Sequence, residues 1–83
     1  MPAEETIHVE RVQTGLRIEK SLLKVLKSLA EYLELPLGNL VEGIVLHAFE
    51  GKAPFTRETQ SKIQDLKRIY ECGLTSTVSH KLF

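Results

Sequence analysis

Apolar and polar residues follow two different periods near the start of the chain. From Val12 to Ile18, residues that suit a buried face alternate with polar or small ones, which is the pattern of a half-buried strand. From Leu22 onward the apolar positions recur every three or four residues, which is the pattern of an amphipathic helix. We therefore predict a short strand that runs directly into a helix over about residues 19–33.

A second helix is predicted directly after the first. Pro36 cannot continue the first helix, but proline suits the first turn of a new one. The apolar spacing then predicts a helix over about residues 37–49. Gly43 lies in its middle, where glycine costs stability, so we expect a close approach of another helix at this point.

The residue pattern in the last third of the chain predicts one more helix and a tail. Thr56 is a suitable N-cap, and Gly73 is expected to close a helix that covers about residues 56–72. This helix carries a narrow apolar stripe, which consists of Ile63, Leu66, Ile69 and Tyr70. Residues 74–83 are rich in Ser and Thr, and two outcomes stay open for them: disorder, or docking of Leu82 and Phe83.

The predicted strand has no partner within its own stretch of the sequence. Its unpaired N–H and C=O groups invite pairing with a second copy of the chain. We therefore expect a mainly α fold in which two copies intertwine as a homodimer with a two-stranded ribbon. Nine inward-facing apolar residues are predicted to form the shared core: Leu16, Ile18, Leu22, Leu26, Leu29, Leu40, Val41, Ile44 and Val45.

These elements divide the chain into three parts. We predict a flexible N-terminal arm over residues 1–11, a core over residues 12–50, and a C-terminal helix with a tail over residues 51–83. A domain of 83 residues buries only about 60% of its unfolded surface and needs additional stabilisation. Oligomerisation is the form of stabilisation that we expect here.

Other sources of stabilisation, and catalysis, have little support in the sequence. Cys72 is the single cysteine, and the three histidines have no zinc-ligand spacing, so we expect neither a disulfide nor a metal nor another cofactor. No nucleophile–base pair or phosphate-binding glycine loop stands out, so an enzyme is not expected. The lone thiol and the lack of a signal-peptide or membrane-spanning pattern favour a cytoplasmic protein without a membrane partner.

Charge is balanced over the whole chain but not along it. The 83 residues carry 11 basic and 11 acidic side chains. Residues 11–27 nevertheless contain five Lys or Arg side chains against one glutamate, whereas residues 28–51 contain four glutamates and no basic side chain. A local positive field of this kind can steer a polyanion to the predicted ribbon, and a two-stranded ribbon can enter the major groove of DNA.

The strand, the helix that follows directly, and the turn Leu-Pro-Leu-Gly-Asn-Leu-Val over residues 35–41 form one pattern over residues 12–49. In this pattern the chain resembles the ribbon-helix-helix family of DNA-binding proteins, to which the Arc and methionine repressors belong. The resemblance implies a homodimer whose strands pair antiparallel and lie in the DNA major groove. It also implies a small bacterial transcriptional regulator, such as a repressor, that associates with the nucleoid when bound.

The resemblance further implies which side chains face the bases, namely those of Gln13, Gly15 and Arg17. Arginine can form two hydrogen bonds with guanine, and glutamine can form two with adenine. Gly15 departs from the family, in which this central position carries a side chain. Its backbone can approach the DNA closely, and DNA shape is expected to contribute more to specificity.

A second set of residues is implied to contact phosphate. The backbone N–H groups of Leu37, Gly38 and Asn39, at the start of the second helix, can bind a phosphate oxygen. Pro36 replaces the usual capping hydroxyl of the family and removes one side-chain contact to that phosphate. Three basic side chains add attraction that does not depend on sequence: those of Arg11, Lys20 and Lys24.

One alternative hypothesis stays open. The helix and tail over residues 56–83 exceed a minimal ribbon-helix-helix core, and an antitoxin uses such an extension to bind its toxin. A module of this kind would bind a partner protein, and the two functions are compatible. The same extension could instead pack on its own dimer, or connect neighbouring dimers in a higher-order complex on DNA.

Overall fold

The first helix begins where the alternating pattern ends. In the computed structural model, which describes residues 6–82, α1 covers Lys20–Leu33. The Glu19 carboxylate caps it, because its Oε1 accepts the backbone N–H of Leu22 at 2.8 Å and the Ser21 hydroxyl at 2.7 Å. These hydrogen bonds, first that of Ser21 and then that of Leu22, hold the pKa of Glu19 below its usual range. At the other end, Glu34 adopts a left-handed conformation with φ of 58°.

The second helix, α2, covers Leu37–Phe49, as the apolar spacing predicts. Pro36 is its N-cap in an extended conformation, with a fixed φ that suits the approach to a helix. The chain leaves α2 through Glu50 and Gly51, and Gly51 has φ of 69°, where a side chain would be strained.

The third helix, α3, covers Arg57–Ile69 and ends earlier than predicted. Thr56 is its N-cap, as predicted, and its hydroxyl accepts the Thr59 N–H at 3.2 Å. The predicted closure at Gly73 is wrong. Tyr70 is the C-cap, and Glu71 adopts the left-handed conformation with φ of 54°.

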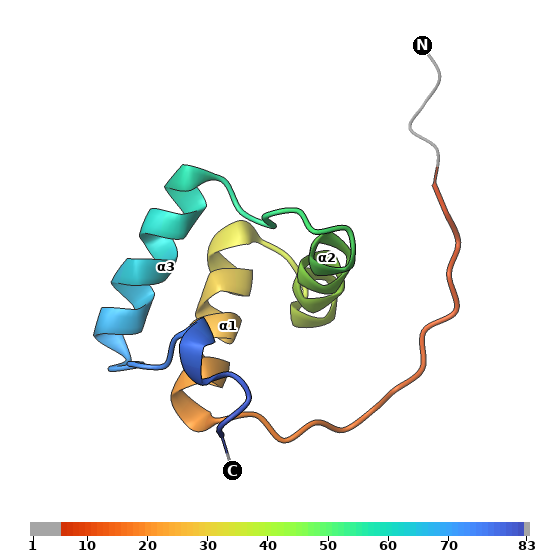
Figure 1. The fold of residues 1–83 in the computed structure, drawn as a ribbon. Coiled ribbons are helices and arrows are strands. Elements are labelled where there is room, and N and C mark those ends of the chain that lie inside the picture. The colour runs from red at the N-terminus through yellow and green to blue at the C-terminus, as the bar shows by residue number, and fades with distance from the viewer. Residues whose placement is uncertain (1–5, 83) are drawn as a thin grey trace.

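Helix α1 lies at the centre of the fold, with α3 packed on one side and α2 on the other (Figure 1). The buried residues Leu29, Ala30 and Leu40 form the core. Seven half-buried side chains surround it: Leu26, Leu33, Leu37, Ile44, Phe55, Ile63 and Leu66.

The expectation of a close helix approach at Gly43 is wrong within the single chain, and the apolar stripe of α3 packs only in part. Ile69 is 68% exposed, and Ile63 and Leu66 are the residues of the stripe that contact the core. A Cβ atom placed on Gly43 would meet nothing within 4 Å among residues 6–82, so no other helix of this chain approaches it closely.

The chain after α3 returns along α1 to the beginning of that helix (Figure 1). Cys72 is buried, and the Lys67 ammonium donates a hydrogen bond to the Leu74 carbonyl at 2.6 Å. A 3₁₀ helix, η1, follows at Ser76–Val78. Leu82 is half-exposed, and Phe83 lies outside the described residues.

Residues 6–19 are extended and run outside the helical body (Figure 1). The described part of the chain contains no strand, so the fold is mainly α, as predicted, and the predicted ribbon stays a prediction. Residues 1–5 of the predicted arm lie outside the described range. None of the helices in residues 6–82 has the length and apolar character needed to span a membrane.

Candidate nucleic-acid interface

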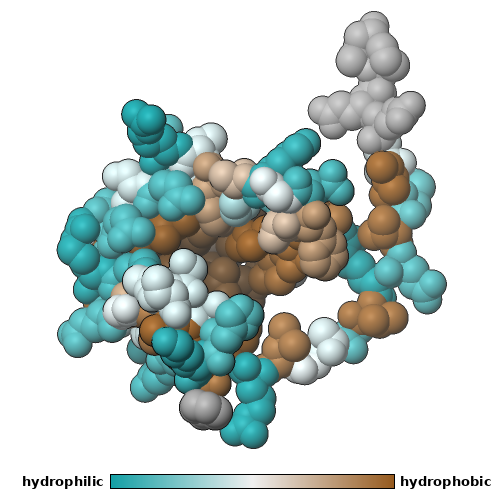
Figure 2. All heavy atoms as spheres, viewed as in Figure 1, coloured by the Kyte–Doolittle hydropathy of each residue, from teal (hydrophilic) through white to brown (hydrophobic). Residues whose placement is uncertain are grey.

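An open apolar hollow of about 600 Å³ lies between the helices and residues 6–19, which we call the extended segment. Val12, Thr14, Leu16 and Ile18 line it from the extended segment. On the helical side it is lined mainly by apolar residues of α1 and α2: Leu23, Leu26, Leu37 and Val41. Figure 2 shows this space, with hydrophobic side chains on both of its sides.

The residues between these four do not line the hollow. Gln13, Gly15 and Arg17 are exposed, and a Cβ atom at Gly15 would meet nothing within 4 Å among the described residues. The residues that line the hollow therefore alternate with those that do not, in the order that the sequence pattern suggests, although Val12 and Leu16 are themselves 79% and 71% exposed in the single chain. Contact of the outward residues with bases stays a prediction.

The beginning of α2 lies beside the same hollow. Leu37 and Gly38 line it, together with Val12 and Leu16 of the extended segment. The first N–H groups of any helix lack a partner within the helix, and Pro36 provides no side-chain acceptor for them. The N–H groups of Leu37, Gly38 and Asn39 thus remain available to an external acceptor, whereas α1 and α3 have side-chain caps.

Arg11 connects the extended segment to α2 through a two-pronged ion pair. Its Nε donates to Glu42 Oε2 at 2.8 Å, and its Nη2 donates to Glu42 Oε1 at 2.9 Å. The hydrogen bond raises the pKa of Arg11 and lowers the pKa of Glu42. Two of the guanidinium nitrogens are thus occupied, and a phosphate contact by Arg11, which stays a prediction, would compete with this pair.

The other predicted phosphate contacts come from α1. Lys20 and Lys24 are exposed on its first two turns. The Lys24 ammonium lies 6.0 Å from the centre of the Tyr70 ring, and the Tyr70 hydroxyl accepts a hydrogen bond from Ser28 at 3.0 Å. The end of α3 therefore helps to position Lys24, which the sequence did not indicate.

The nine residues predicted for a shared core fall into three groups. Leu29 and Leu40 are buried within the single chain, so their burial does not depend on a second copy. Leu26, Val41, Ile44 and Ile18 are half-buried. Leu16 is 71% exposed, and Leu22 and Val45 are also exposed.

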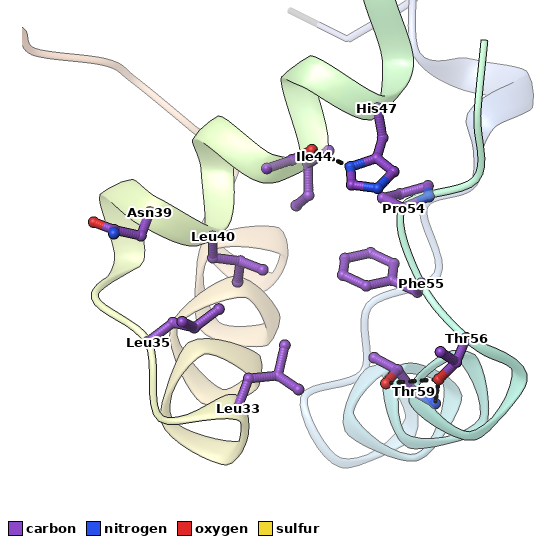
Figure 3. Close-up of a pocket in the computed structure, with 11 residues that line it drawn as sticks. Leu33, Leu35, Asn39, Leu40, Ile44, His47, Pro54, Phe55, Thr56 and Thr59 are labelled. Atoms are coloured by element: carbon purple, nitrogen blue, oxygen red, sulfur yellow. Dashed lines mark hydrogen bonds between the residues drawn. The ribbon is translucent and has the colours of Figure 1, made fainter. Parts of the chain in front are cut away.

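A smaller apolar groove of about 220 Å³ lies on another face of α2, between the end of α1 and the loop before α3 (Figure 3). Leu33, Leu40 and Ile44 line it together with Phe55. His47 lies at its edge and donates from Nδ1 to the Gly43 carbonyl at 2.8 Å. No group of three potential metal ligands occurs in residues 6–82.

Comparison of the chain with protein-family models, with curated proteins and with solved structures finds no match.

Sequence reasoning missed two polar interactions at this site. The Arg11–Glu42 pair joins residues 31 positions apart, and a separation of this kind leaves no periodic signal. The capping role of Glu19 could have been found, because an acidic side chain directly before a helix interacts favourably with its N-terminus.

Proposed function

We propose that two copies of this chain form an intertwined homodimer that binds a specific DNA sequence and regulates transcription. In this dimer residues 12–18 of both copies pair as an antiparallel ribbon and enter the major groove. The observation that carries the proposal is the division of this segment. Val12, Thr14, Leu16 and Ile18 line the hollow beside α1 and α2, whereas the residues that alternate with them, Gln13, Gly15 and Arg17, do not.

The distribution of exposed apolar side chains supports the proposal that a second copy of the chain occupies the hollow. Helix α2 is apolar on nearly all sides, and a helix of that kind is normally buried all round. In the single chain only Leu40 of α2 is buried. The exposed apolar side chains on the segment and on α2 are those of Val12, Leu16, Val45, Leu46 and Phe49.

The exposed backbone of the segment supports pairing of two strands. Extended N–H and C=O groups without partners are a template for another strand. Two identical segments related by a twofold axis pair antiparallel, and the resulting ribbon has the width that the major groove admits. The outward arginine and glutamine then carry hydrogen-bonding groups that distinguish guanine and adenine.

The beginning of α2 supports a phosphate contact that fixes the ribbon on the DNA. Its free N–H groups and its positive dipole end favour a phosphate oxygen. Gly38 leaves room for close approach, and the exposed Lys20 adds attraction. Contacts of this kind orient a protein on DNA, whereas base contacts provide sequence preference.

The alternative, in which residues 56–83 capture a partner protein, has less support. Ile63 and Leu66 of α3 already pack on the chain's own core, and Cys72 is buried. Part of the apolar surface of this extension is thus used within the chain, and Ile69 and Leu82 are the aliphatic side chains that stay exposed for a partner.

Selection from a pool of duplexes with a randomised centre tests the proposal. The full-length protein is expected to enrich a short palindromic site. Fluorescence anisotropy should then show tighter binding to the enriched duplex than to a scrambled one, both at low salt and at about 150 mM, because base contacts persist when phosphate attraction is screened. Enrichment of no sequence, together with weak and equal binding that salt abolishes, would contradict it.

A further inference from the structure

The C-terminal tail is attached to the helical body at several points. Leu74 lines an apolar pocket with Val25 and Leu29 of α1 and Ile63 of α3. The Lys67 ammonium holds the Leu74 carbonyl at 2.6 Å. Hydrogen bonds within η1 and from the Lys81 N–H to the Val78 carbonyl, at 2.9 Å, then fix the direction of the last residues.

This path ends beside Arg17. Leu82 lines an open hollow of about 650 Å³, which we call the tail hollow, together with Arg17, Ile18, Glu19 and Leu22. In Figure 1 the C-terminal end lies next to the junction between the extended segment and α1. The last described residues of the chain thus meet the end of the proposed ribbon.

The charges at this junction are mainly positive. Arg17 lines the tail hollow, and Lys20 and Lys81 are exposed and lie next to a lining residue along the chain. Glu19 is the acidic residue of the tail hollow, and its carboxylate is engaged by Ser21 and Leu22 at the beginning of α1. The acidic side chain that lines the tail hollow is therefore already engaged by hydrogen-bond donors.

We propose that the tail is a second DNA-binding element, in which Lys81, with His80 beside it, contacts the backbone phosphates that flank the ribbon. This inference rests on the proposed function, because the position of the DNA follows from the ribbon. Leu82 acts as the apolar anchor that keeps Lys81 close to Arg17. The partner of Lys81 is a phosphate of the duplex, so the contact adds affinity without sequence preference.

Lys81→Ala in the full-length protein tests the tail contact. We expect roughly tenfold weaker binding to the enriched and the scrambled duplex alike, and a salt slope lower by about one for each phosphate that the variant no longer neutralises. Lys81→Arg should bind like the unmodified protein, because the charge is kept. Lys52→Ala is the matched control, since this exposed lysine lies in the loop between α2 and α3 and should leave the affinity unchanged.

The possible outcomes test the tail contact and the proposed function separately. Unchanged affinity and salt slope for Lys81→Ala, with a normal unmodified protein, would overturn the tail contact alone. Equal weakening by Lys52→Ala would also overturn it, because the effect would then be one of total charge. If the unmodified protein binds no duplex, the proposed function fails and the tail contact fails with it.

Discussion

Arg17 is the side chain on which sequence preference depends most in the proposed complex. It is exposed, and it lies on the outward side of the extended segment. Gly15, two positions earlier, offers only its backbone, so each copy presents Gln13 and Arg17 as its base-reading side chains.

Arg17→Ala is therefore expected to reduce discrimination at one base position per half-site by about 1–3 kcal/mol. Anisotropy measured on the enriched duplex and on its single-base variants would show this effect. Arg57→Ala, an exposed arginine at the beginning of α3, is the matched control and should change little. An equal reduction on every sequence would mean that Arg17 contacts phosphate only.

The Arg11–Glu42 ion pair between the extended segment and α2 is expected to be lost in acid. The pKa of Glu42 lies below its ordinary value of 4.5, first because of the hydrogen bond from Arg11 and also because of its charge. A lowered carboxylate pKa means that the interaction is complete above the ordinary value and disappears as the pH falls through the lowered one.

Between neutral pH and about pH 5 the NMR signal of Arg11 Nε–H should therefore keep the shift of a paired guanidinium. It should move to the free position only at a pH below 4.5, the ordinary value for the pKa of Glu42. Glu42→Gln should give the free position already at neutral pH. If the Arg11 Nε–H signal depends on pH in the same way in the Glu42→Gln variant and in the unmodified protein, the ion pair is ruled out.

Among the secondary-structure elements, the three helices could be predicted from the sequence, whereas the ribbon stays a prediction. Pro36 and Thr56 set the beginnings of α2 and α3, because a fixed φ and a capping hydroxyl act locally. The end of α3 could not be predicted, because Glu71 takes the left-handed conformation that glycine usually takes.

The strand differs from the helices in what it requires. A helix satisfies its backbone within one segment, whereas a strand needs the N–H and C=O groups of another one. No segment of residues 6–82 pairs with residues 12–18, so a single chain leaves them extended. Likewise, the Arg11–Glu42 pair and the path of the tail to Arg17 depend on the tertiary fold and leave no signal in the spacing of residues.

The packing of α1 against α3 provides much of the core of one chain. Leu29 is only 2% exposed and packs in the cluster to which Ile63 and Leu66 contribute. Leu29→Ala should lower the free energy of unfolding by about 2–5 kcal/mol, because it removes buried apolar surface and leaves a cavity. Urea unfolding followed by circular dichroism measures this, with the exposed Ile69→Ala as control. Similar small changes in both variants would contradict the observed core.

For the whole molecule, the balance of buried and exposed apolar surface is unusual. Five residues of the described range form the buried apolar set, whereas Phe49 and Val12 are each 79% exposed. A small domain with so little burial is marginal alone. The proposed homodimer covers the apolar hollow, and stability should then increase with protein concentration.

Leu16→Glu separates the two views of this surface. In the single chain Leu16 is 71% exposed, and a charge there would cost little. In the homodimer the same charge would be buried in the shared core, which costs several kcal/mol and should abolish both dimerisation and folding. Ile69→Glu, at 68% exposure directly after Arg68 on α3, is the matched control and should leave both intact. Thermal unfolding and light scattering measure the outcome, and a Leu16→Glu protein that is as dimeric and as stable as the unmodified one would refute the intertwined dimer.

The pairing of the two strands of the ribbon can be measured directly by isotope-filtered NOE spectroscopy on an equimolar mixture of labelled and unlabelled protein. An intertwined homodimer predicts NOEs between residues 12–18 of one copy and the same residues of the other. It also predicts NOEs from Leu16 of one copy to α2 of the other. If residues 12–18 show only contacts within their own chain, with the chemical shifts of an unpaired segment, the ribbon does not form and the proposed mode of DNA recognition is wrong.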